Sequence, residues 1–347
     1  MEHPCRNTIN GTIFHQQSDR NSENSENSCF ALFISFEKGY TDFKRLQQPK
    51  FMALDRRIYM REILISTESG SDLPESLVQK YQIHVVPMHV IMNGESFDDG
   101  HFPIDRVFDY FEETGRIPTT SAVNEGEYID FFHRLQEEHP GCVIYHFAYS
   151  AAASSTYDHA RLAIDDEGFQ DIYLIDTKSV SGGCTAYISE AYRLIRERGE
   201  QITDYSAFAD ELRSISDHIE CQFIPATLAY LRAGGRVSNA SYIAANILNL
   251  KPLIEIDSTG HLIATRKYRG SMRKIVDKFY RDFLSRYDCR KDTLYLMSGK
   301  GLAQDVLDRM KEIAVENGFQ NTEYVMTGCT ISCHGGKGAM GIAAVTV

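Results

Sequence analysis

Residues 62–81, EILISTESGSDLPESLVQKY, decide the fold class of this chain. The first five residues form a short apolar run typical of a buried strand, and TESGSD then breaks the run with small and polar side chains. Pro74 begins a predicted helix whose apolar positions Leu77, Val78 and Tyr81 share one face. A strand, a hydroxyl-rich loop and a helix form the unit of a parallel sheet, in which ligands bind beyond the carboxyl ends of the strands.

The same unit recurs further along the chain. The apolar run 142–148, CVIYHFA, leads into YSAAASSTY at 149–157, and the run 172–176 leads into TKSVSGG at 177–183; a helix is expected after each loop. A further strand is expected over 84–92, where Pro87 indicates an edge position or a bulge. Hydroxyl-rich loops at several strand ends predict a polar rim for an anionic ligand.

Residues 117–128, IPTTSAVNEGEY, add a cluster of hydroxyls. Pro118 restricts the backbone there, so we expect Thr119, Thr120 and Ser121 to leave a turn and lead into a helix that carries Tyr128. Two interpretations remain open. The hydroxyls cap the helix, or they and the free N–H groups of its first turn hold a carboxylate or phosphate.

The pattern changes after residue 203, and we expect a second α/β domain from there. Short strands at 253–256 and 262–265 flank a turn and predict a hairpin, a helix is expected before residues 248–256, and further elements are expected at 293–297 (strand), 304–317 (helix) and 341–347 (strand). The expected organisation is therefore an extension at 1–59, a parallel-sheet α/β/α domain at 60–205 and a mixed α/β domain at 206–347.

Composition narrows the class of protein. The chain has 347 residues, 43% of them hydrophobic, and no apolar run is long enough to span a bilayer. A net charge of −12 argues against nucleic acid as a partner. The eight cysteines lack paired spacing, which indicates reduced thiols and a cytoplasmic location. Residues 1–59 include NSENSENS and are expected to be disordered or to lie outside the functional protein.

Two segments of the second half invite a chemical interpretation. Arg236 follows two glycines, which indicates either a guanidinium held close to backbone or a surface arginine beside a turn. Residues 329–341, CTISCHGGKGAMG, fit neither a haem, a zinc nor a dinucleotide motif, so we expect a glycine-rich turn that presents His334. Asp98 and Asp99 are expected in a solvated turn rather than at a metal.

Short motifs that follow one another in the same order as in a known family are spread along the chain from residue 61 almost to its end. They are ESGSDL (68–73), VVP (85–87), DG (99–100), PTTS (118–121), SSTY (154–157), DT (176–177), LRAGGRVS (231–238), KPL (251–253) and HGGKG (334–338). In these the chain resembles the DegV family of bacterial fatty-acid-binding proteins. Residues 1–59 match nothing in that family.

The resemblance implies a two-domain α/β carrier, not an enzyme, that binds one long-chain fatty acid between its domains. A separate kinase, similar to dihydroxyacetone kinase, would phosphorylate the presented carboxylate; no cofactor, metal or integral membrane segment is implied. The implied ligand-binding residues are Thr119, Thr120, Ser121, Ser150, Ser154, Arg236 and His334.

The chain departs from the family pattern in ways that bear on the site. Glu68 replaces an aspartate, Ser155 replaces a glycine, and Ala151 stands where many members have the second of two adjacent serines, which leaves the contact to Ser150 or Ser154. Two other functions stay open. One is an acyl hydrolase in which a serine of residues 149–157 is activated by His334, and the other is a lipid-binding regulator without a kinase.

Overall fold

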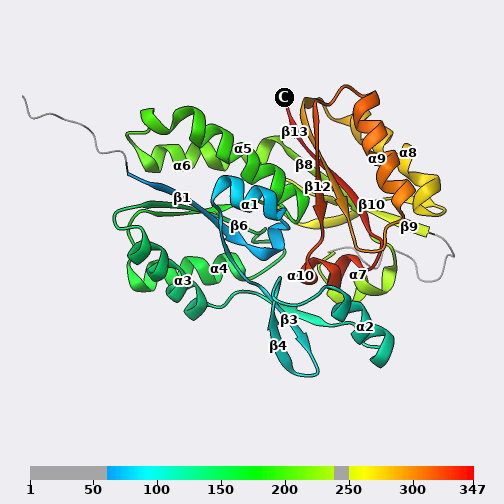
Figure 1. Ribbon diagram of the computed structural model, residues 1–347, viewed down its shortest axis with the longest axis horizontal. Coiled ribbons are helices and arrows are strands. Elements are labelled where there is room, and N and C mark those ends of the chain that lie inside the picture. Colours follow the sequence, from blue (N-terminus) through cyan, green and yellow to red (C-terminus); the bar gives the residue numbers. More distant parts are fainter. Residues whose placement is uncertain (1–60, 238–249) are drawn as a thin grey trace, which may run out of the picture. The chain divides into compact units, whose positions relative to one another are not determined.

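The computed structural model describes residues 61–237 and 250–347, which lie within one compact unit, Ile58–Val347. A parallel sheet and a separate mixed sheet dominate it, so the expected α/β class is confirmed (Figure 1). The expected extension at 1–59 and the helix expected before residue 248 lie outside the described residues. The domain boundary near residue 205 stays a prediction.

Four parallel strands form the first sheet in the order β2-β1-β6-β7. They are β1 (Ile63–Glu68), β2 (His84–Val86), β6 (Val143–Ala148) and β7 (Ile172–Asp176). Every residue of β6 is buried, as expected where helices cover both faces of a parallel sheet. The helices are α1 (Glu75–Tyr81), α3 (Glu125–Glu138), α4 (Thr156–Glu167), α5 (Gly182–Arg198) and α6 (Tyr205–Ser214), with 3-10 turns η1 (Ser69–Ser71), η2 (Gly199–Gln201) and η3 (Ile215–His218).

Two hydrophobic clusters cover the faces of this sheet. Ile65 belongs to the cluster that holds Tyr187 of α5 and Phe208 of α6, whereas the neighbouring Leu64 belongs to the cluster that holds Phe132 of α3. Successive strand residues point to opposite faces, so one apolar run supplies both clusters. The continuous apolar runs seen in the sequence are thus explained by burial on both sides.

Six strands form the second sheet in the order β10-β9-β8-β13-β11-β12. They are β8 (Ile219–Ile224), β9 (Leu250–Ile256), β10 (Leu262–Arg269), β11 (Cys289–Ser298), β12 (Asn321–Met326) and β13 (Met340–Thr346), and only β11 and β12 pair in parallel. Helices α8 (Met272–Arg286) and α9 (Gln304–Glu316) cover one face, and α5 contacts the other through Ala186 (Figure 1). The predicted hairpin is confirmed as β9 and β10.

A small antiparallel sheet, β4-β3-β5, corrects two expectations. It consists of β3 (His89–Met92), β4 (Glu95–Asp98) and β5 (Thr119–Ser121), and α2 (Asp105–Thr114) lies between β4 and β5 in the chain. The single strand expected over 84–92 is wrong, because the chain breaks at Pro87 and β2 and β3 join different sheets. The three hydroxyl residues are a strand and not a helix start; Asn124 caps α3 instead, in a capping box with Glu127.

Two short helices, α7 (Leu228–Gly234) and α10 (Cys329–Gly335), complete the described part. The glycine-rich turn expected at His334 is therefore wrong in detail, because His334 lies in the last turn of α10 and the turn follows it. No helix in 61–237 or 250–347 is long and apolar enough to cross a membrane. The six cysteines in these ranges are free and buried.

Candidate functional site

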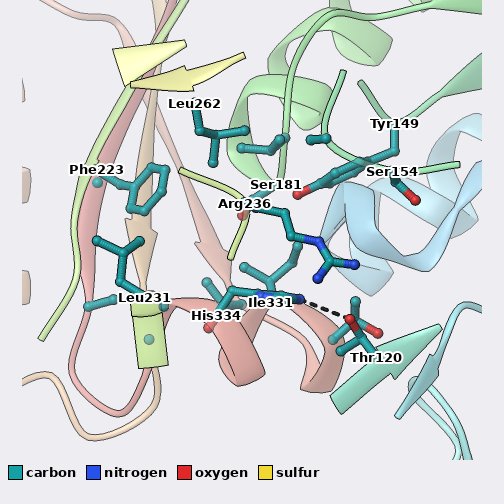
Figure 2. Close-up of a pocket in the computed structure, with 18 of the residues that line it drawn as sticks. Thr120, Tyr149, Ser154, Ser181, Phe223, Leu231, Arg236, Leu262, Ile331 and His334 are labelled. Carbon is teal, nitrogen blue, oxygen red and sulfur yellow. Dashed lines mark hydrogen bonds between the residues drawn. The ribbon is translucent and has the colours of Figure 1, made fainter. Parts of the chain in front are cut away.

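A cavity with about 980 Å³ of empty space, counting solvent at its mouth, lies among β5, the loop after β6, α7, α10 and the mixed sheet. Much of its wall is apolar, with contributions from Val180, Phe223, Leu231, Val237, Leu262 and Met297. Figure 2 shows Phe223, Leu231 and Leu262 on one side, and Thr120 and Ser154 on the other. The cavity thus has an apolar part and a polar end.

Thr120 and His334 meet at the polar end of the cavity. The Oγ1 atom of Thr120 and the Nε2 atom of His334 are 2.9 Å apart, although the residues are 214 positions apart in the sequence (Figure 2). Thr120 is half-buried because β5 alternates its side chains, and the neighbouring Thr119 and Ser121 are exposed. Ser121 still borders the cavity, whereas Thr119 does not.

His334 is held as a neutral base. Burial, together with the positive charge of Arg236, lowers the pKa of His334 from an ordinary 6.5 to about 4. Its Nε2 atom contacts Thr120, and its Nδ1 atom is buried without a hydrogen-bond partner in 61–237 or 250–347. At neutral pH the pair therefore presents an uncharged ring and a hydroxyl to the cavity.

Arg236 supplies a positive charge at the same end. Its side chain is exposed and borders the cavity, and one guanidinium nitrogen, Nη1, donates to the carbonyl of Gly234 at 2.7 Å. Figure 2 shows the guanidinium directed toward the side on which Thr120 and Ser154 lie. The guanidinium is thus held close to backbone, as the first interpretation expects, and the residue is also exposed beside the turn at Gly235, as the second expects.

The serine loop contributes Ser154 and Ser155 but not Ser150. Ser154 borders the cavity and its Oγ accepts a hydrogen bond from the Thr156 N–H at 3.3 Å. Ser150 is fully buried outside the lining, and its hydroxyl donates to the Gly260 carbonyl at 2.8 Å. The structure therefore brings Thr120, Ser121, Ser154, Arg236 and His334 together, and it leaves Thr119 and Ser150 away from the cavity.

Two buried carboxylates hold the start of α10, and the sequence did not reveal them. Asp72 accepts the Gly328 N–H at 2.8 Å and the Ser181 hydroxyl at 2.5 Å; Asp99 accepts the Cys329 N–H at 2.9 Å and the Ser69 hydroxyl at 3.0 Å. The solvated turn expected at Asp99 is wrong, because this side chain is only 4% exposed. Burial and the nearby charge of Asp99 raise the pKa of Asp72 well above its usual range.

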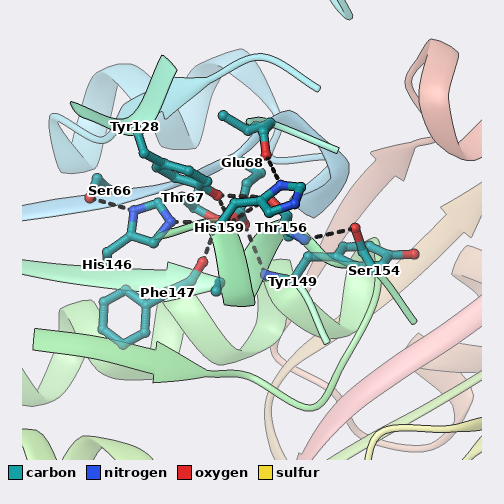
Figure 3. Close-up of polar contacts among 12 residues, drawn as sticks. Ser66, Thr67, Glu68, Tyr128, His146, Phe147, Tyr149, Ser154, Thr156 and His159 are labelled. Atoms are coloured by element: carbon teal, nitrogen blue, oxygen red, sulfur yellow. Dashed lines mark hydrogen bonds and ion pairs between the residues drawn. The ribbon is translucent and has the colours of Figure 1, made fainter. Parts of the chain in front are cut away.

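A third buried carboxylate, Glu68, contacts both ends of the serine loop (Figure 3). It accepts hydrogen bonds from the Tyr128 hydroxyl, from His146 Nε2 at 3.1 Å and from the Tyr149 N–H at 2.8 Å. Thr156 at the other end of the loop also donates to it, at 3.4 Å. Although burial opposes ionisation, His146 and the other donors lower the pKa of Glu68, so the loop is anchored to a buried anion.

The arrangement is suited to binding an amphipathic anion. Hydroxyls and one guanidinium suit a carboxylate or phosphate, and the apolar wall suits a hydrocarbon chain. Within 61–237 and 250–347, no three His, Cys, Asp or Glu side chains gather as metal ligands. Burial and the nearby charge of Asp99 raise the pKa of Cys329 to about 12, which favours the neutral thiol at pH 7.

Comparison with known proteins agrees with the motifs. A family model described as an uncharacterised protein of the DegV family matches residues 62–347. A DegV domain-containing protein of Clostridium acetobutylicum is 28% identical over 289 residues, which cover 82% of this chain and 98% of its own. This chain belongs to the DegV family. The resemblance stated from the sequence is thereby confirmed.

Solved DegV-family structures share the fold. A fatty-acid-binding DegV protein of Thermus thermophilus aligns with a TM-score of 0.72 at 24% identity and covers 82% of this chain and all of its own. The fatty acid kinase B3 protein of Streptococcus pneumoniae, solved with linoleic acid, aligns with a TM-score of 0.70 at 17% identity over the same share. Structurally characterised members of the DegV family thus bind fatty acids.

Proposed function

We propose that this DegV-family protein binds a long-chain fatty acid in the cavity, with its carboxylate at Thr120, Ser121, Ser154, Arg236 and His334. The observation that supports this most is the division of one cavity into an apolar part and a polar end. An amphipathic acid satisfies both parts at once. A phosphate or a short polar acid would leave the apolar wall unfilled.

The two parts of the ligand have different roles in this proposal. Each buried CH₂ contributes about 0.8 kcal/mol, so the tail accounts for most of the affinity. A hydrogen bond to a charged carboxylate contributes about 1.5–3 kcal/mol and requires defined geometry, so the head-group residues fix the orientation. His334, neutral in the free protein, becomes easier to protonate beside a bound carboxylate because an anion stabilises the imidazolium.

We further propose that the protein presents the carboxylate to a separate kinase, of the dihydroxyacetone-kinase type, in the cytoplasm. Ser121 and Arg236 are exposed at the polar end, so a partner protein can reach a head group bound there. The named role of the Streptococcus pneumoniae relative supports the same partnership. The protein itself then acts as a carrier and needs no cofactor.

The geometry gives the hydrolase alternative less support. Ser150 donates to the Gly260 carbonyl, and Ser154 accepts from the Thr156 N–H. The polar partner of His334 Nε2 is the hydroxyl of Thr120. A serine nucleophile needs a direct hydrogen bond to its base, and none joins His334 to Ser150, Ser154 or Ser155 in the described structure.

The binding site is tested with two variants of β5. The delipidated full chain, Thr120→Val and Thr119→Val are titrated with palmitate. Thr120→Val removes the hydroxyl beside His334 and should raise the Kd about tenfold, a loss of about 1.4 kcal/mol. Thr119→Val changes the adjacent exposed residue and should bind like the parent. Equal affinities for all three proteins would contradict the site, and no binding of palmitate by the parent would contradict the function.

The partnership needs a separate assay. The loaded protein is mixed with a fatty acid kinase of the dihydroxyacetone-kinase type and ATP, and acyl phosphate is trapped as its hydroxamate. Formation that depends on both proteins is expected from the carrier. Binding without acyl phosphate would favour the regulator, and ester turnover lost in Ser154→Ala would favour the hydrolase.

A further inference from the structure

Gly234, the last residue of α7, lies directly against the ring of His334. A Cβ atom placed on Gly234 would lie 2.2 Å from His334 Nδ1, 3.1 Å from its Cγ and 3.2 Å from its Cε1. Carbon atoms do not approach ring atoms this closely, so any other residue at 234 displaces the imidazole. The same Nδ1 atom is buried and has no hydrogen-bond partner among the described residues.

Gly234 also contacts Arg236, the charged residue at the polar end of the cavity. The Gly234 carbonyl accepts a hydrogen bond from the Arg236 guanidinium at 2.7 Å. The chain turns between them at Gly235, which has a φ of +63°. Gly234 therefore leaves space for the His334 ring because it has no side chain, and its carbonyl accepts the hydrogen bond from Arg236.

We propose that Gly234 is a positioning residue that sets the place of the His334 ring at the polar end of the cavity. The inference rests on the proposed fatty-acid function for its consequence on binding, but the placement of the ring stands independently. The position is helical, and its φ is not in the left-handed region. Backbone conformation does not require glycine there, so the approach of His334 is the reason for it.

The smallest substitution, Gly234→Ala, distinguishes a need for glycine in the backbone from a need for space beside the His334 ring. Alanine favours a helix over glycine by up to about 1 kcal/mol, so the change should not disturb α7 itself. The ring of His334 has to move by roughly 1 Å to restore a normal contact, and shifts of this size at a binding site can cost roughly 100-fold. The movement breaks the 2.9 Å contact with Thr120.

The experiment compares the full-length parent, Gly234→Ala and Gly199→Ala. A Cβ on Gly199 has nothing within 4 Å, so this variant is the matched control. The Cε1–H signal of His334, assigned by its loss in His334→Gln, is followed from pH 4 to 8 by NMR, and palmitate binding is measured on the same samples.

In Gly234→Ala we expect the pKa of His334 to rise from about 4 toward 6.5, because the ring leaves its buried position, and the Kd for palmitate to rise at least tenfold. Gly199→Ala should match the parent in both. An unchanged titration of His334 in Gly234→Ala would overturn the inference. A shifted titration with no palmitate binding in any of the proteins would leave the positioning role intact and reject the proposed function.

A double variant decides the case in which Gly234→Ala does not fold. In Gly234→Ala/His334→Ala the clashing ring is absent, so the double variant should fold as stably as His334→Ala, and Gly234→Ala should cost no further affinity in that background. A double variant that stays unfolded would show that glycine is needed for another reason, and the inference would be wrong.

Discussion

Replacing Tyr128 by phenylalanine removes one hydrogen-bond donor from the buried carboxylate of Glu68. Both side chains are fully buried, and Glu68 keeps His146, Thr156 and the Tyr149 N–H as donors. A hydrogen bond to a charged group contributes about 1.5–3 kcal/mol, and a fully enclosed site gives water no easy access to replace it. We therefore expect Tyr128→Phe to lower the free energy of unfolding by about 1.5–3 kcal/mol.

The control is Tyr268→Phe. The Tyr268 hydroxyl also donates to a carboxylate, that of Asp282, at 2.9 Å. The Asp282 side chain is 24% exposed and also pairs with Lys278, so water and lysine replace the lost donor. We expect Tyr268→Phe to lower the free energy of unfolding by less than about 1 kcal/mol. Both variants are unfolded with urea at pH 7, and the midpoints are compared at equal slope.

The stability difference between the parent and Tyr128→Phe should also change with pH, in a direction set by the pKa of Glu68. The pKa of Glu68 is lowered in the folded protein, so its stabilising contribution is present above its unfolded pKa and is lost as the pH falls through the folded value. The difference between the parent and Tyr128→Phe should therefore shrink in acid. A loss in Tyr128→Phe no larger than that in Tyr268→Phe, or a difference that grows in acid, would refute this account of the Glu68 cluster.

Two further predictions concern stability. The pKa of His334 is lowered to about 4, so folding favours its neutral form. The stability that this gives is present above about pH 6.5 and is lost as the pH falls toward 4. In urea unfolding, His334→Gln should therefore lose less stability than the parent between pH 7 and pH 4.5. Glu190 is buried between Arg193 and Arg290, which outweigh the effect of burial and lower its pKa to about 2. Glu190→Gln should lower the free energy of unfolding by about 2–4 kcal/mol. Glu197→Gln removes an exposed partner of Arg193 and should lower it by less than about 1 kcal/mol. Equal losses of stability in thermal unfolding would contradict the buried cluster.

The sequence by itself determined the parallel sheet and its loops. The runs at 62–66 and 142–148 are mostly apolar at consecutive positions because both faces of β1 and β6 are covered. The hairpin of β9 and β10 follows from a local turn with the sequence DSTG at 257–260. The motifs of the DegV family were also readable, because each is a short run of neighbouring residues.

Only the tertiary structure decided which hydroxyls reach the cavity. Thr119–Ser121 becomes a strand because it pairs with β3, and this pairing turns Thr120 toward His334 and Thr119 away from it. Ser150 lies in the expected loop, but its hydroxyl is bound to Gly260, 110 residues away. Asp99 is polar and adjacent to a glycine, yet it is buried because α10 offers it a backbone N–H. The direction and burial of a side chain, and the pairing of a short strand such as β5, depend on partners that are distant in the sequence, whereas local turns and long apolar strands are set largely by neighbouring residues.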